Sequence, residues 1–177
     1  MNQENSLHYG LTSFQQAFQL AVNVCDLLGH GANRTAVHLL LETAAAETQL
    51  GTFADPTPNG AGSGLTQGDP IAVKDVRQRT RGNDAELVRQ AFEFDVYSLQ
   101  PEDLREDPLK ALVFTRLFYK LRPEPIPVSA WERARYWKTF YNTVAGSGTQ
   151  EHYIHSARRW LYGPASPLKM SIHRWPR

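Results

Sequence analysis

Residues 34–50 constrain the fold more than any other part of the sequence, because this segment is apolar on almost every side. Residues 36–41 and 44–46 are nearly all aliphatic, and the segment stops at Gly51. A helix without a polar face is typically buried at the centre of a core. We therefore expect a central helix over residues 34–50, with Asn33 as its N-cap and the other helices packed around it.

The rest of the chain shows helical spacing of apolar residues, with capping residues at several starts. The predicted helices cover residues 12–28, 71–79, 84–99, 109–121, 130–142 and 150–163, and a separate segment opening at Gln100 leads into the fourth of these. Their predicted N-caps include Asp69, Asn83, Ser129 and Thr149. No segment shows the alternation of a half-buried strand, and no internal repeat is present. We predict a mainly α fold, with one domain over residues 1–177, any small β element confined to 51–68, and an irregular basic tail over 161–177.

Composition and charge exclude several classes of protein. The chain has 177 residues, of which 41% are hydrophobic, which is enough for one buried core. The net charge of +1 argues against a nucleic-acid partner. Residues 130–177, however, carry eight Lys or Arg against two Glu, a local charge of +6 that favours an acidic partner or polymer.

No apolar run reaches the length of about 18 residues that a membrane span needs, so we expect no membrane span. Cys25 is the one cysteine, which excludes an intrachain disulfide and predicts a buried thiol.

Residues 51–70 interrupt the helical pattern. They contain five of the 12 glycines and three of the 11 prolines. A loop of this length inside a small domain is more often functional than not. Gly62 and Gly64 allow a ligand to approach the backbone closely, and the Gln67 amide is able to bond it, although a plain turn explains the same residues.

Glu47 is the candidate acid of the chain. It follows three alanines near the end of the predicted central helix, so its carboxyl loses hydration and faces the negative end of the helix dipole. Both effects favour the protonated form, and we predict a raised pKa, as a general acid needs near neutral pH. The alternative is an exposed Glu late in a helix. Glu42, five positions earlier, is a rival acid about 140° around the same helix.

Three segments taken together resemble a known family. They are Glu47-Thr48, the Gly-Ser-Gly-Leu-Thr-Gln run at 62–67, and Tyr141-Asn142 followed by Gly146. In this order and spacing they resemble the soluble lytic transglycosylases of the lysozyme-like superfamily. Members of that family carry a Glu-Ser pair, then a G-A-x-G-L-M-Q-like loop, then an A-Y-N-x-G segment. The resemblance covers about residues 33–160. The sequence departs from the pattern at Thr48, Ser63, Thr66, Phe140 and the Gly68-Asp69-Pro70 run, which bears on substrate fit more than on acid chemistry.

The resemblance implies a lysozyme-like fold and cleavage of the β-1,4 bond between N-acetylmuramic acid and N-acetylglucosamine in peptidoglycan. It implies that Glu47 serves as acid and then as base, with no metal or cofactor, and that the product carries a 1,6-anhydromuramyl end. The residues that it implies in glycan binding or in lining the cleft are Thr48, Gly64, Leu65, Gln67, Tyr141 and Asn142. Peptidoglycan strands are the expected partner.

Residues 113–127 and 136–149 also look like segments of bacteriophage virion-associated lysozymes and transglycosylases. The first ten residues lack the basic and apolar regions of a secretory signal. We therefore expect a phage entry or lysis enzyme, held in the virion or the host cytoplasm before it reaches the periplasm, with other virion proteins as further partners. A toxin moved by a dedicated secretion machine fits the same absence of a signal.

Two other readings of the chain stay open. A hydrolytic muramidase needs a second carboxylate, for which Asp55 and Asp69 are the candidates. A non-catalytic virion component or glycan-binding module would keep the fold without the reaction. Metal binding is not expected, because the pairs His38/Glu42 and His152/His155 lack an evident third ligand.

Overall fold

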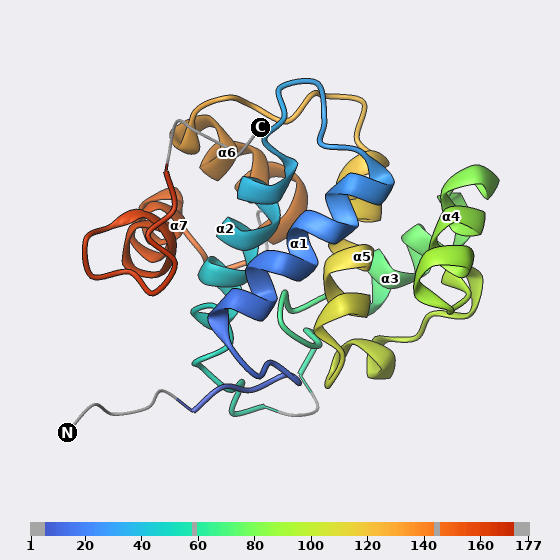
Figure 1. Cartoon of the computed structure of the whole chain (residues 1–177), viewed down its shortest axis with the longest axis horizontal. Coiled ribbons are helices and arrows are strands. Elements are labelled where there is room, and N and C mark those ends of the chain that lie inside the picture. Colours follow the sequence, from blue (N-terminus) through green and yellow to red (C-terminus); the bar gives the residue numbers. More distant parts are fainter. Residues whose placement is uncertain (1–5, 58–59, 144–145, 172–177) are drawn as a thin grey trace.

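The computed structural model describes residues 6–57, 60–143 and 146–171, and within them the chain is mainly α-helical, as predicted (Figure 1). The helices are α1 (Phe14–Leu28), α2 (Ala36–Thr48), α3 (Pro70–Arg79), α4 (Gly82–Phe92), η1 (Val96–Ser98), η2 (Pro101–Leu104), α5 (Pro108–Lys120), α6 (Ala130–Trp137), η3 (Lys138–Asn142), α7 (Gln150–Ala157) and η4 (Arg158–Tyr162). The irregular tail predicted over 161–177 begins two residues later, because Leu161 and Tyr162 belong to η4. Residues 163–171 form no regular helix, and the last six residues lie outside the described ranges. None of the described helices is long and apolar enough to cross a bilayer.

Helix α2 lies at the centre of the core, as its sequence predicts. Every residue of α2 except Glu47 is buried. Helices α1, α5, α7 and η4 all pack against it. Figure 1 shows α1 crossing α2, with α5 and α7 on opposite sides and the α3–α4 pair beyond α5. A carboxyl at Glu47 is therefore carried by the most enclosed helix of the molecule.

Side-chain caps start three helices where the sequence predicts them. Asp69, Ser129 and Thr149 each accept a backbone N–H of the first turn, at 2.7, 3.2 and 3.1 Å. The predicted cap at Asn33 is wrong, because α2 begins at Ala36. Asn33 instead donates its side-chain N–H to the Ile126 carbonyl at 2.6 Å, a partner distant in sequence.

The predicted helix over 84–99, capped by Asn83, is wrong at both ends. Helix α4 begins at Gly82, so Asn83 lies inside it. It ends at Phe92 because Glu93 takes a left-handed conformation (φ 61°), a turn that glycine normally marks. Short 3₁₀ turns, η1 and η2, then lead into α5.

The predicted helices over 130–142 and 150–163 each combine two helical forms. Helix α6 passes into the π-helical turn η3, and α7 passes into the π-helical turn η4. Such turns are uncommon and are frequent at functional sites. The first of them carries two of the residues singled out in the sequence, Tyr141 and Asn142.

The loop after α2 is closed by one antiparallel bridge. The Ser63 N–H lies 3.0 Å from the Gly68 carbonyl oxygen, and the reverse bond is 2.8 Å. The sequence allows for a small β element within residues 51–68. Among the described residues of this segment, that element consists of this single bridge. Between its two residues the backbone turns through Gly64 at φ +76°.

Replacing Gly64 with alanine is expected to destabilise the protein by roughly 1–3 kcal/mol. Besides its positive φ, Gly64 lies so close to η2 that a Cβ would sit 2.1 Å from the Leu104 carbonyl oxygen. Urea unfolding measures the loss. Gly82→Ala is the matched control, since the nearest atom to its Cβ would be the Tyr97 hydroxyl at 3.9 Å. Equal stability of the two variants would contradict this close approach.

Candidate active site

Glu47 lies on the last turn of α2 and is only partly buried. Its neighbours Ala46 and Thr48 are buried, whereas the Glu47 side chain keeps some exposed surface. Trp137 of α6 donates its indole N–H to Oε1 of Glu47 at 3.0 Å. Among the described residues, Oε2 accepts no hydrogen bond. One oxygen is therefore fixed, and the other is open to a ligand.

Burial raises the pKa of Glu47 to about 7, and the hydrogen bond from Trp137 opposes part of that rise. The direction predicted from the sequence is confirmed, and loss of hydration is the dominant cause. A carboxyl with a pKa of about 7 exchanges its proton near neutral pH. It is therefore suited to giving up a proton and taking one back.

Thr48 and Leu65 fasten the glycine-rich loop to α2. Thr48 Oγ1 lies 2.7 Å from the Leu65 carbonyl oxygen and 3.1 Å from the Ala44 carbonyl oxygen, and it accepts the Gly51 N–H at 3.1 Å. Both side chains are buried, with exposures of 1% for Thr48 and 0% for Leu65. The family resemblance implies Thr48 in glycan binding and the backbone around Gly64-Leu65 in lining the cleft. In the structure the two buried side chains lie on the core side, and the Thr48 hydroxyl holds the loop against the end of α2.

Tyr141 links the same loop to η3. Its hydroxyl donates to the Thr66 carbonyl oxygen at 2.7 Å, and its ring packs on two aromatic rings of α5. Burial raises the pKa of Tyr141, and the carboxylates of Glu47 and Asp69 raise it further. Tyr141 therefore lies within electrostatic reach of both acids.

A groove of about 870 Å³ is lined by Tyr141 and Asn142 of η3 and by Asp69 at the start of α3. Asn142 Oδ1 accepts a hydrogen bond from Lys138 Nζ at 2.7 Å, which fixes the amide. Glu47 is not among the described residues that line this groove. Tyr141 lines this groove and also lies within electrostatic reach of Glu47.

Gly64 and Gln67 line a different cavity, of about 620 Å³. Gln67 Nε2 donates to the Gly64 carbonyl oxygen at 3.0 Å, so its amide is turned back on its own loop. The structure thus brings Tyr141 and Asn142 together at one groove but separates Gln67 from them. The loop between residues 62 and 69 contributes to both hollows.

The two candidate second carboxylates lie in different places. Asp55 lines the smaller cavity with Gln67, and its Oδ1 accepts the hydroxyl and the N–H of Thr57, at 2.6 and 2.8 Å. These bonds lower the pKa of Asp55 and mark a turn. Asp69 caps α3 and lines the groove with Tyr141. Of the two, Asp69 alone shares a groove with the sequence-predicted site residues of η3.

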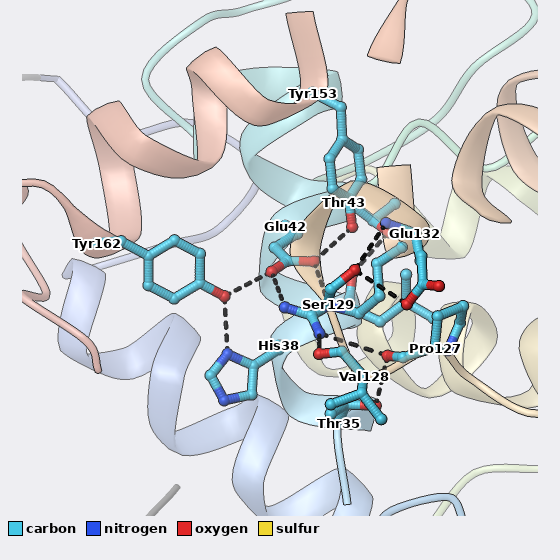
Figure 2. Close-up of polar contacts among 12 residues, drawn as sticks. Thr35, His38, Glu42, Thr43, Pro127, Val128, Ser129, Glu132, Tyr153 and Tyr162 are labelled. Atoms are coloured by element: carbon cyan, nitrogen blue, oxygen red, sulfur yellow. Dashed lines mark hydrogen bonds and ion pairs between the residues drawn. The ribbon is translucent and has the colours of Figure 1, made fainter. Parts of the chain in front are cut away.

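Glu42 is unsuited to the role of rival acid, because it is enclosed in a buried polar cluster (Figure 2). Its exposure is 0%, and Arg133 donates to both carboxylate oxygens, at 2.7 and 2.6 Å. Tyr153 and Tyr162 donate their hydroxyls to the same carboxylate at 2.6 Å each. His38 Nδ1 lies 2.7 Å from the Tyr162 hydroxyl at the edge of the cluster. No substrate reaches such a carboxylate without unpacking the core.

The structure also bears on the histidine pairs considered as metal ligands and on the Cys25 thiol. His152 Nε2 lies 2.8 Å from the Ala46 carbonyl oxygen. Over the ranges that the structure describes, no three His, Cys, Asp or Glu side chains gather as a metal site requires. Burial raises the pKa of Cys25 to about 12, so this thiol stays protonated.

Trp137 is the residue of this site that sequence reasoning missed. From its spacing it is a core aromatic, and its side chain is indeed buried, at 1% exposure. No local sequence signal marks this role, because the partner of Trp137 lies 90 residues away and the two meet through tertiary packing. Only the structure shows that its polar N–H is directed at Glu47.

Comparisons with known proteins find no relative of this chain. No protein-family model, curated protein or solved structure matches it. Its chemistry therefore has to follow from the site itself. A partly exposed carboxyl whose pKa is raised to about 7 is suited to general acid–base chemistry near neutral pH.

Proposed function

We propose that this chain cleaves peptidoglycan as a lytic transglycosylase of the lysozyme-like superfamily, with Glu47 as acid and base. The observation that carries the proposal is the state of the Glu47 carboxyl. It ends the buried central helix, its pKa is raised to about 7, and one of its oxygens is held by Trp137. In this proposal the glycan strand occupies the groove lined by Tyr141 and Asn142, and Tyr141 also lies within electrostatic reach of Glu47.

In the proposed reaction, protonated Glu47 donates its proton to the glycosidic oxygen, and the bond from C1 of N-acetylmuramic acid to that oxygen breaks. The acetamido oxygen of the same sugar stabilises C1, so one protein carboxyl suffices. Glu47 then takes the proton of the C6 hydroxyl, whose oxygen bonds to C1. Glu47 ends protonated, no water is consumed, and the product is a 1,6-anhydromuramyl end.

The proposal extends to wall adsorption and to the biological setting of the enzyme. The local charge of +6 over residues 130–177 favours adsorption to an anionic cell wall. The proposed setting is a phage particle or lysis system, with the enzyme in the virion or host cytoplasm before it reaches the periplasm. Peptidoglycan strands are the proposed partner, and other virion proteins would hold the enzyme in a particle.

One observation favours a second candidate function, a hydrolytic muramidase with Asp69 as the second carboxylate. Asp69 lines the same groove as Tyr141, and both Asp69 and Glu47 act electrostatically on that tyrosine. With a glycan strand in this groove, the Asp69 carboxylate would be able to activate the attacking water. Asp55 lines the other cavity and is not favoured by this observation.

Mass spectrometry of the products released from purified peptidoglycan separates these functions. The transglycosylase predicts muropeptides with anhydro ends, lighter by one water than hydrolysis products. Reducing muramic ends, lost in Asp69→Asn but kept in Asp55→Asn, would assign the muramidase. No release from walls that a known muramidase digests would leave a non-catalytic virion or glycan-binding protein.

A further inference from the structure

Helix α6 presents two side chains to α2, and each contacts one of its acids. Arg133 pairs with Glu42 in the cluster of Figure 2. Trp137, one turn later, donates its indole N–H to Glu47. Because both pairs join the same two helices, the buried ion pair sets the position of α6 from which Trp137 reaches the carboxyl.

Helix α7 holds the Trp137 ring from another side. The ring of Tyr153 packs against that of Trp137, with centroids 5.1 Å apart, and the Tyr153 hydroxyl donates to Glu42. Gly148 lies directly against the indole, since a Cβ there would be 2.5 Å from Cη2 of Trp137. Tyr153 and Gly148 therefore pack against the indole on two sides and support the orientation in which its N–H meets Glu47.

We propose that Trp137 is a positioning residue of Glu47, which holds Oε1 so that Oε2 carries the proton toward the glycan. The proposal rests on the proposed function for its chemistry but not for its geometry. Removal of the indole N–H should leave the carboxyl in place yet free to rotate. It should also remove a hydrogen bond that favours the charged form.

The sign of the effect on titration follows from this hydrogen bond. The Trp137 bond lowers the pKa of Glu47 against the larger effect of burial. A variant without the N–H should therefore have a higher Glu47 pKa. An acid catalyst must be protonated, so activity on the alkaline side would persist to higher pH while the maximal rate falls.

Other titratable groups near Glu47 are on three elements. Burial raises the pKa values of Tyr119 on α5 and Tyr141 on η3, so both phenols stay neutral near pH 7. His152 on α7 bonds the Ala46 carbonyl oxygen. The Glu47→Gln variant isolates the Glu47 contribution, because any pH-dependent change that persists there has another source.

A first experiment needs no enzymatic activity. The indole N–H resonances of ¹⁵N-labelled protein are followed against pH, and that of Trp137 is assigned by its loss in Trp137→Phe. The chemical shift of the Trp137 N–H should change with pH, with a midpoint near the pKa of Glu47, about 7. This change should vanish in Glu47→Gln. The Trp131 indole, on the same helix and 51% exposed, is the internal control and should show no such step. A Trp137 signal that does not change with pH in wild-type protein would overturn the proposal.

A second experiment uses pH–rate profiles on peptidoglycan. Trp137→Phe keeps the ring and most of its packing, and Trp131→Phe is the matched control. We expect the alkaline limb to move to higher pH in Trp137→Phe, with a lower maximal rate, and to stay in place in Trp131→Phe. A lower rate with an unmoved limb would show that Trp137 has only a packing role. Absence of cleavage by wild-type protein would count against the proposed function, while the indole titration would still test the Trp137–Glu47 contact.

Discussion

Replacing Glu47 with glutamine is expected to lower peptidoglycan cleavage by roughly 10²–10⁴-fold, the usual contribution of a positioned general acid. Glutamine has nearly the shape of protonated glutamate, and its amide oxygen is able to accept the Trp137 N–H that now reaches Oε1. What it lacks is a proton to give to the glycosidic oxygen. Release of soluble muropeptides from purified walls measures the loss.

The same variant should be at least as stable as the wild-type protein at neutral pH. The pKa of Glu47 is raised in the folded state, so the native protein holds a proton that the unfolded chain releases. This contribution to stability is full below the ordinary glutamate pKa and is lost as the pH rises toward about 7. Glutamine removes that pH-dependent cost, so a catalytic role predicts lost activity without lost stability.

The matched control is Glu151→Gln, a change of an exposed glutamate in the first turn of α7. It should cleave walls at the wild-type rate. Glu47→Gln with wild-type cleavage would contradict an acid role, whereas lost cleavage together with lost stability would point to a structural role. Each outcome therefore discriminates between an enzyme and a binding module.

The sequence was sufficient for features that depend on local chemistry. The all-round apolar character of α2 predicted its place in the core, and its three alanines predicted the desolvated carboxyl at Glu47. Asp69, Ser129 and Thr149 cap helices because their side chains bond neighbouring N–H groups. These interactions span three residues or fewer, so the local sequence contains them.

Features that depend on distant partners were not predictable in the same way. Asn33 has the right chemistry for a cap but bonds a carbonyl 93 residues away. Gln67 turns toward its own loop because Gly64 bends the chain there, and this places it away from Asn142. The N–H of Trp137 meets Glu47 only after α6 docks on α2. The sequence pattern shows which chemical group such a residue carries, but it does not show toward which distant partner the side chain points.

The second large effect concerns the buried cluster, where Arg133→Met is expected to cost about 3–5 kcal/mol of unfolding free energy. Arg133 and Glu42 are 1% and 0% exposed, and the guanidinium also donates to the Pro127 and Val128 carbonyls at the start of α6. Methionine fills similar space but leaves the Glu42 charge buried without its counter-ion. The two tyrosine hydroxyls that remain are donors without charge.

Urea unfolding at neutral pH measures this loss, with Arg135→Met as the control because that side chain is exposed on the same helix. The double variant Glu42→Gln, Arg133→Met should recover part of the loss, since it buries no unpaired charge. A double variant as unstable as the sum of the single changes would contradict coupling between the two residues.

Because Arg133 sets the position of α6, its loss should also weaken the Trp137–Glu47 contact. The pH-dependent change of the Trp137 indole N–H chemical shift should then be smaller in Arg133→Met than in the wild-type protein.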